Sequence, residues 1–152
     1  MYKFLDHAIH IDRRKNGEVK MNKIYYYPAI FTVEDVGFSV RFPDLPGCYT
    51  EGETIEEAYK KATSAIGLYA QNEDGNFVFP EASAPNNIAL EKDEFLVLIE
   101  FNLIEYLKNT SDKSVKKTLT IPSWLNNLAE QNNVNFSNVL QNALKEQLNV
   151  NN

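Results

Sequence analysis

The sequence has little of what metal-bound, secreted or membrane-spanning proteins usually contain. It has one cysteine and two histidines in 152 residues, so it can form no intramolecular disulfide and contains no Cys/His set with zinc spacing. Its longest apolar run, residues 95–101, is interrupted by Glu100 and is too short to cross a bilayer. The first twenty residues contain no apolar segment like that of a signal peptide. We therefore expect a cytoplasmic protein with no metal, cofactor or membrane span.

The composition predicts a folded chain with an uneven distribution of charge. A hydrophobic fraction of 43% and an aromatic fraction of 12% are sufficient for a packed core. The net charge is −6, but residues 113–152 contain four lysines and two glutamates and therefore carry +2. The remaining residues carry −8. An acidic front part favours a basic protein partner over phosphates, and the basic tail indicates a different partner.

The front part has the pattern of a small sheet crossed by one helix. Residues 24–33 are rich in β-branched and aromatic side chains, which predicts a strand with Pro28 at an edge position or bulge. Residues 38–42 alternate apolar and polar side chains and predict the second strand of a hairpin. Residues 48–50 can supply a short third strand. Residues 95–101 are almost continuously apolar, which predicts a last strand covered on both faces.

The helix between these strands begins at a capping box. In this motif the Thr54 hydroxyl and the Glu57 carboxylate each accept a hydrogen bond from a free main-chain N–H. Apolar side chains then recur at helical spacing, which predicts one buried face. This face comprises Ile55, Ala58, Tyr59, Ala62, Ile66 and Tyr69. The front part is therefore expected to be a β-β-β-α-β unit of the α+β class.

The tail has a different pattern. A polar linker, residues 109–114, precedes a short alternating strand that ends at Pro122, and two helices follow, the second with Ser137 as its expected N-cap. About 35 residues cannot bury a core of their own, so the tail should fold as an intertwined dimer. The residues expected in the dimer core are Leu119, Ile121, Leu125, Leu128, Leu140 and Leu144. The predicted boundaries are an N-terminal extension at 1–22, a front domain at 23–108 and a tail domain at 115–152.

The order of strand, proline, helix, turn and helix in residues 116–148 resembles the ribbon-helix-helix family of bacterial repressors. In that family two strands form an antiparallel ribbon that enters the DNA major groove. With Pro122 as the anchor, the resemblance implies that Lys116, Thr118 and Thr120 point to the bases. It also implies that Ser137 and Asn138, at the start of the second helix, contact a phosphate. Two threonines at reading positions, where the family often has arginine, leave the operator sequence open.

The front part is similar to HicB antitoxins, whose domain has been likened to a partial ribonuclease-H-like sheet. The residues that carry this similarity are YPA at 27–29, GFSV at 37–40, FPDLPGC at 42–48, Thr50, Gly52, Thr54, and EEA at 56–58. The resemblance implies a HicA-like partner, a small basic toxin that cleaves RNA with a histidine. It further implies that the chain masks this toxin, represses its own operon and forms a homodimer through the tail, with higher assemblies left open.

The acidic loop between residues 42 and 54 is expected to face the toxin. The toxin-binding residues predicted there are Asp44, Leu45, Tyr49, Glu51 and Glu53. Complementary charges at such a surface steer association. We expect no catalytic residue and therefore no enzymatic activity.

Two other functions remain open from the sequence. Carboxylates at Asp44, Glu51, Glu53, Glu56 and Glu57 could hold Mg²⁺ in a metal-dependent nuclease with a DNA-targeting tail. Against this, Glu56 and Glu57 are explained by their place at the start of a helix. The third possibility is a ligand-responsive transcriptional repressor.

Overall fold

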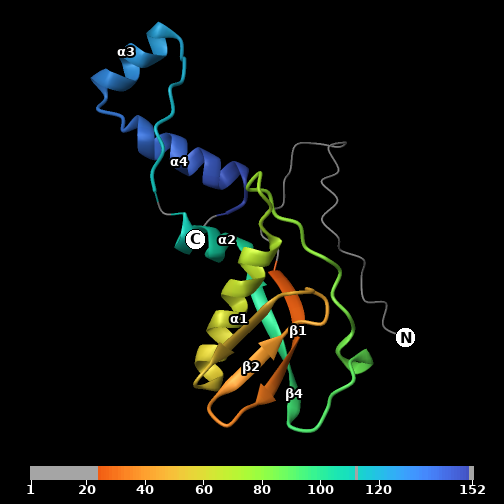
Figure 1. Ribbon diagram of the computed structural model, residues 1–152. Coiled ribbons are helices and arrows are strands. Elements are labelled where there is room, and N and C mark those ends of the chain that lie inside the picture. The colour runs from red at the N-terminus through yellow and green to blue at the C-terminus, as the bar shows by residue number, and fades with distance from the viewer. Residues whose placement is uncertain (1–23, 112, 151–152) are drawn as a thin grey trace.

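Eight helices and strands, with one short 3-10 helix, make up the part of the chain that the computed structural model describes, residues 24–111 and 113–150. The elements are β1 (Ile24–Val33), β2 (Phe38–Arg41), β3 (Tyr49–Gly52), α1 (Ile55–Ala70), η1 (Pro85–Asn87), β4 (Glu94–Asn102), α2 (Leu103–Thr110), α3 (Ser123–Gln131) and α4 (Phe136–Gln147). The strands form one antiparallel sheet in the order β3-β2-β1-β4, and α1 crosses it (Figure 1). The predicted β-β-β-α-β unit and the α+β class are confirmed.

The core lies between α1 and one face of the sheet. Successive side chains of a strand point to opposite faces, so the inner face receives every second residue. The buried residues of this layer are Tyr25, Tyr27, Ala29 and Phe31 from β1, Val40 from β2, Ile99 and Phe101 from β4, and Ala58, Ala62 and Ile66 from α1. The predicted helix stripe is confirmed at its centre. At its ends it is wrong, because Ile55 is 50% and Tyr69 is 38% exposed.

Pro28 lies in β1 where only one neighbouring strand is present. It is opposite Leu98 of β4, while β2 pairs with β1 only from Ile30 onward. The Glu100 N–H is donated to the Tyr59 hydroxyl at 3.3 Å and so points away from β1. Main-chain groups alternate in direction along an antiparallel strand, so the Pro28–Leu98 pair also exchanges no hydrogen bond. The missing N–H of Pro28 therefore breaks no ladder bond, and the edge interpretation is confirmed.

The prediction that residues 95–101 are covered on both faces is wrong. β4 is an edge strand of the sheet, and its side chains alternate between the core and the outer face. Ile99 and Phe101 are buried, whereas Leu98 is 48% exposed and Glu100 is also exposed. A run of apolar residues alone does not distinguish an edge strand from a central one.

The helix α2 was not expected from the sequence. Asn102 caps it by accepting hydrogen bonds from the N–H groups of Ile104 and Glu105. The Tyr106 ring lies against Gly67 of α1, where any Cβ would come within 2.3 Å of the ring. Because α2 continues to Thr110, the first two residues assigned to the linker belong to this helix.

The tail contains both predicted helices but, in the single chain, no strand. The described residues between Thr110 and Ser123 form neither helix nor strand, and no residue of α3 or α4 is buried. In Figure 1 these two helices lie beyond α2, away from the sheet. The predicted N-cap Ser137 is wrong, because the Asn135 side chain caps α4 by accepting the Asn138 N–H at 3.0 Å.

None of the helices described is long and apolar enough to cross a membrane. The expectation that residues 1–22 form an N-terminal extension lies outside the described residues.

Candidate partner-binding sites

The loop predicted to contact a partner divides into a buried part and an exposed part. Leu45 was predicted to bind the toxin, but it is 1% exposed and its side chain packs in the core of the chain. The Leu45 N–H donates to the Phe42 carbonyl and the Cys48 N–H donates to the Leu45 carbonyl, so two short turns meet at Leu45. Cys48 is also buried, and burial raises the pKa of its thiol. Tyr49, in contrast, is 71% exposed.

Asp44 is occupied by contacts within the chain. Its carboxylate accepts the Ser83 N–H at 2.9 Å and the Ser83 hydroxyl through its other oxygen. The Tyr27 hydroxyl donates to the Pro80 carbonyl nearby. These bonds fasten the segment between α1 and β4 to the sheet; we call residues 24–110, which contain the sheet, α1 and α2, the sheet domain. No local sequence pattern predicts this contact, because Asp44 and Ser83 are 39 positions apart.

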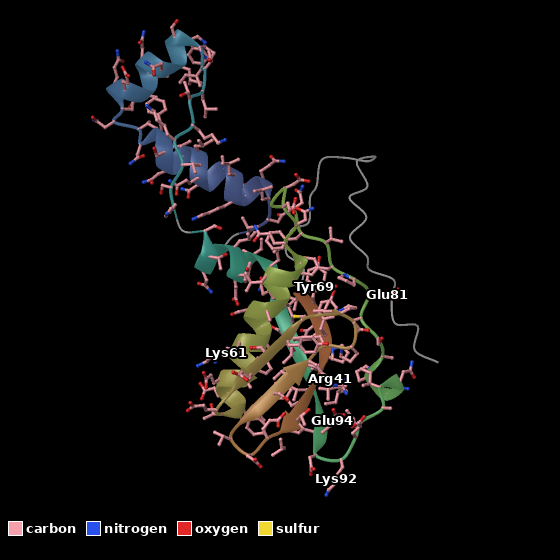
Figure 2. All side chains as sticks on the ribbon, in the orientation of Figure 1. Arg41, Lys61, Tyr69, Glu81, Lys92 and Glu94 are labelled. Carbon is pink, nitrogen blue, oxygen red and sulfur yellow. The ribbon has the colours of Figure 1, made fainter. Side chains whose placement is uncertain are left out.

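Tyr49, Glu51 and Glu53 lie at two adjoining hollows beside β3. One hollow has a volume of about 460 Å³ and is lined by Ser39, Val40, Tyr49, Thr50, Glu51 and Lys61. The other, of about 420 Å³, extends toward Glu34, Val36, Glu53 and Glu57. Ser39, Glu51 and Lys61 line both, so the hollows form one groove that we call the β3 groove. Lys61 marks its α1 side in Figure 2.

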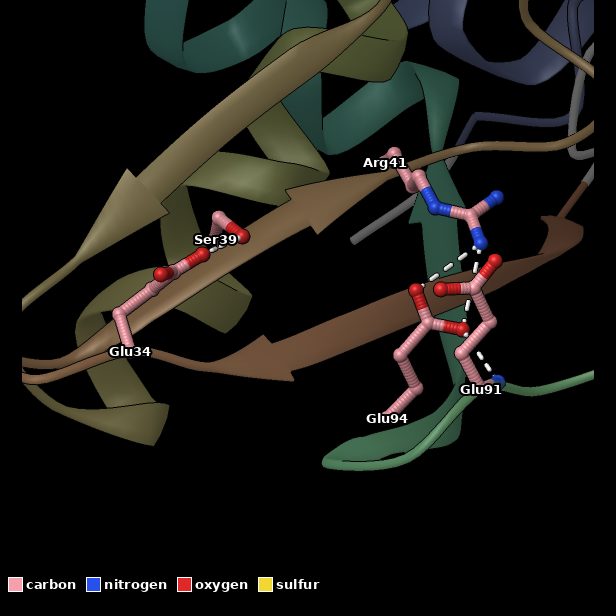
Figure 3. A network of polar contacts seen from close by, with 5 residues as sticks. All are labelled: Glu34, Ser39, Arg41, Glu91 and Glu94. Carbon is pink, nitrogen blue, oxygen red and sulfur yellow. Dashed lines mark hydrogen bonds and ion pairs between the residues drawn. The ribbon is translucent and has the colours of Figure 1, made fainter.

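The β3 groove carries more negative charge than its one cation balances. Its carboxylates are Glu34, Glu51, Glu53 and Glu57, and its cation is Lys61. Lys61 pairs with Glu57 at 2.8 Å, and this bond, together with the Glu53 N–H, lowers the pKa of the Glu57 carboxyl. Glu34 accepts the Ser39 hydroxyl at 2.6 Å (Figure 3). Within the described residues, the carboxylates of Glu51 and Glu53 form no hydrogen bond or close ion pair.

The capping box behind the groove is confirmed, with one difference in its second bond. The Thr54 hydroxyl accepts the Glu57 N–H at 3.2 Å, as predicted. The Glu57 carboxylate accepts the N–H of Glu53, one residue before the cap. Glu56 pairs with Lys60 at 2.7 Å. In the part of the chain that is described, no three His, Cys, Asp or Glu residues could hold a metal ion together. The acidic residues therefore do not assemble the magnesium site of the nuclease alternative.

A second polar network joins β2 to the start of β4. Arg41 donates to both carboxylate oxygens of Glu94, at 3.0 and 3.3 Å, and the Glu91 N–H donates to Glu94 at 2.8 Å (Figure 3). The side chain of Glu94 is only 8% exposed. The Glu91 N–H bond, followed by the Arg41 bonds, lowers the pKa of the Glu94 carboxyl.

This network predicts a loss of stability in acid. Because the pKa of Glu94 is lower in the folded chain, its contribution is complete above the unfolded value of about 4.3 and disappears as pH falls through the folded value. Urea unfolding of wild type and Glu94→Gln should show a stability difference at pH 7 that narrows toward pH 3. Glu91→Gln keeps the main-chain N–H and should remain close to wild type throughout. A Glu94→Gln difference that does not change with pH would contradict this assignment.

In the tail, the predicted base-contacting and core residues are all on the surface of the single chain. Lys116, Thr118 and Thr120 are exposed and alternate with Leu119 and Ile121, which are 63% and 41% exposed. Among the other predicted core residues, Leu140 is half-buried, and Leu125, Leu128 and Leu144 are 40%, 52% and 50% exposed. Apolar side chains on both helices therefore have no cover within this chain.

The predicted phosphate site lies in the first turn of α4. Ser137 and Asn138 follow Phe136, the first residue of the helix. The Asn138 N–H is donated to the Asn135 side chain, so it is not free for a phosphate while that cap is in place. A phosphate contact of Ser137 stays a prediction.

Comparison with known proteins finds a matching family, similar sequences and similar solved structures. The family of HicB-like antitoxins of bacterial toxin-antitoxin systems matches residues 26–144, which include α3 and most of α4. Antitoxin HicB 2 of Photorhabdus laumondii is 41% identical over 46 residues, which are 30% of this chain and 33% of that protein. A toxin-antitoxin complex from Streptococcus pneumoniae contains a chain with 27% identity and a TM-score of 0.52, and the match covers 82% of this chain and 99% of that one.

Proposed function

The chain belongs to the HicB-like antitoxin family, and we propose that it is the antitoxin of a HicA/HicB-type pair. In this proposal the sheet domain binds and masks an RNA-cleaving, HicA-like toxin. The tail dimerises as a ribbon-helix-helix unit and represses the operon that encodes both proteins. The chain acts by binding and carries no catalytic residue. The observation that carries the proposal is the family match over residues 26–144, which includes both the sheet domain and the tail helices.

The β3 groove supports the toxin-binding part of the proposal. It presents Tyr49, Glu51 and Glu53 to solvent, and the two carboxylates form no hydrogen bond or close ion pair among the described residues. An RNA-cleaving protein has to attract a polyanion, so a basic toxin would be complementary to this groove. Of the five residues predicted from the sequence, these three remain in the proposed contact. Asp44 fastens the loop, and Leu45 packs in the core.

The uncovered apolar residues of the tail support the dimer. A chain segment with two helices and no buried residue does not stabilise itself. A second copy would cover Leu125 and Leu128 of α3 and Leu144 of α4, and residues 115–121 of the two copies would pair as a ribbon. This pairing would place Lys116, Thr118 and Thr120 of both copies in one major groove.

The proposal is tested by titrating the purified HicA-like protein encoded beside this chain's gene with the chain itself. Cleavage of a model RNA by that protein should fall to background near the stoichiometry of the complex. The antitoxin alone, with Mg²⁺ or Mn²⁺, should leave the RNA intact. Undiminished cleavage in the mixture, or metal-dependent cleavage by the chain alone that Asp44→Asn abolishes without unfolding it, would contradict the proposal.

Lys116→Ala should weaken operator binding while toxin inhibition stays at the wild-type level. Each tail would lose one cation at the DNA, so affinity should fall about tenfold and the salt dependence should become shallower by one to two charges per dimer. Fluorescence anisotropy with operator DNA at several salt concentrations measures both effects. Lys145→Ala, a change of the same charge near the end of α4, is the matched control. If Lys116→Ala released the toxin, the sheet domain and the tail would not have the separate roles in toxin binding and DNA binding that we propose.

A further inference from the structure

β3 has an unpaired edge whose main-chain groups point to solvent. The Val33 N–H bonds to the Asp93 carbonyl, on the β4 side of β1, so the residues of β1 that face β2 are Ile30 and Thr32. Their partners in β2 are Arg41 and Ser39, which leaves Val40 and Phe38 to bond with β3. The same alternation then directs the main-chain groups of Tyr49 and Glu51 outward.

β3 is short and carries the charge of Glu51, but this edge lacks two other features that protect edge strands. It contains no proline and no lysine, and the outward groups of Tyr49 and Glu51 have no main-chain partner among the described residues. The side chain of Tyr49 is 71% exposed, and Val36, across the groove, is 80% exposed. An extended segment bound at this edge could form main-chain hydrogen bonds with Tyr49 and Glu51. It could also make apolar contacts and lie close to the carboxylates of Glu51 and Glu53.

We propose that the free edge of β3 binds an extended basic segment of the toxin as a fifth strand of the sheet, with a lysine or arginine of that segment placed between Glu51 and Glu53. This inference rests on the proposed function and adds the mode of recognition. In strand addition, main-chain hydrogen bonds provide affinity and side-chain positions beside the edge provide specificity. The charge of the β3 groove, four carboxylates against Lys61, selects a cationic strand.

The opposite edge of the sheet is less suited to the same partner. At β4 the Tyr59 hydroxyl already accepts the Glu100 N–H, so one outward main-chain donor is occupied. The neighbouring outward residue is Leu98, which offers an apolar rather than an acidic contact. This edge therefore provides a matched control for experiments on β3.

The first experiment removes one outward N–H. Tyr49→Pro deletes the donor and the ring, whereas Tyr49→Ala deletes only the ring, and an edge strand tolerates proline where its N–H faces solvent. Binding of a catalytically inactive toxin, measured by calorimetry, should be at least tenfold weaker for Tyr49→Pro than for Tyr49→Ala. Leu98→Pro and Leu98→Ala, at the other edge, should bind alike. Circular dichroism establishes that each variant is folded.

The second experiment tests the charge. Glu51→Gln combined with Glu53→Gln should slow association about tenfold and reduce its dependence on salt. The control, Glu73→Gln combined with Asp74→Asn, removes the same charge at the other end of α1, about 24 Å away for 16 helical residues. Equal effects of the two double variants would show that only the overall charge of the chain matters. They would contradict the proposal that a cation of the toxin lies between Glu51 and Glu53.

Hydrogen exchange reads the main-chain contact directly. The amides of Tyr49 and Glu51 should exchange rapidly in the free chain and at least a hundredfold more slowly in the complex, with the Leu98 amide unchanged. If wild type inhibits the toxin while these amides stay unprotected and the proline variant binds normally, strand addition is wrong and the proposed function stands. If wild type does not bind the toxin, both strand addition and the proposed function are wrong. Protection of this edge by self-association, without the toxin, would assign it to a second copy of the chain.

Discussion

Leu128→Asp is expected to make the chain monomeric and to weaken operator binding by more than a hundredfold. Leu128 is 52% exposed in the single chain and shares the apolar face of α3 with Leu125. In the proposed dimer this face is covered by the second copy. A carboxylate buried there without a partner would oppose association by several kcal/mol, which exceeds the contribution of one truncated leucine. Light scattering measures the mass, and gel-shift titration measures the operator affinity.

Asn127→Asp is the control for Leu128→Asp. Asn127 is the adjacent residue on α3 and is exposed, so this change adds the same charge outside the apolar face. It should preserve the dimer and change operator affinity only severalfold through charge repulsion with DNA. The toxin should still be inhibited by both variants, because the β3 groove lies in the sheet domain. A wild-type chain that is monomeric at micromolar concentration, or a dimeric Leu128→Asp variant, would contradict the proposed tail dimer.

The parts of the fold that follow local rules could be predicted from the sequence. The β-branched and aromatic composition of residues 24–33 indicated β1, alternation of side chains indicated β2, and the capping box at Thr54 placed the start of α1. These signals depend on neighbours within a few residues, so they are visible without the fold. The N-cap of α4 shows the limit of such rules. Asn135 and Ser137 are both good caps, and the structure selects Asn135, two residues earlier than expected.

The contacts that depend on distant residues could not be predicted. The sequence indicated that Asp44 is an exposed acid, but Ser83 occupies it. The helix α2 is only eight residues long, and it is stabilised by its own cap at Asn102 and by Tyr106 packing on Gly67. The outer face of β4 is exposed at Leu98 and Glu100, and the apolar composition of the strand does not reveal this. In each case the decisive partner lies on another element.

The candidate site was predicted in part for the same reason. Tyr49, Glu51 and Glu53 were identified because they belong to the acidic loop, and the structure places them at one groove. Lys61 and Glu34, which also line that groove, were not identified because they belong to a helix and a turn. The ribbon at residues 115–121 stays a prediction, because an antiparallel ribbon between two copies needs a second chain.

Gly52→Ala is expected to lower the free energy of unfolding of the sheet domain by about 2 kcal/mol or more. Overpacking a core typically costs about 1–3 kcal/mol. Gly52 ends β3 and is buried against the first turn of α1. A Cβ there would lie 2.4 Å from the main-chain nitrogen of Ala58 and 2.8 Å from its Cα. Main-chain atoms inside a helix cannot move aside as a flexible side chain can, so β3 and α1 would have to separate.

The comparison with Gly75 isolates the cause of that loss. Gly75 has a φ of 78° and open space within 4 Å of where a Cβ would lie, so Gly75→Ala introduces backbone strain without a clash and should destabilise by only about 1 kcal/mol. Ala58→Gly should fail to rescue Gly52→Ala, because the closest contacts are with the main chain of residue 58, which glycine retains. Urea denaturation of Gly52→Ala, Gly75→Ala, Ala58→Gly and the Gly52→Ala/Ala58→Gly double variant measures these differences. Rescue by Ala58→Gly would show that the Ala58 methyl group, rather than the helix backbone, limits how closely β3 approaches α1.

The Gly52→Ala change should also affect toxin binding. Since Glu51 and Glu53 flank Gly52, the same shift of β3 should weaken binding of the toxin, whereas Gly75→Ala should leave it unchanged.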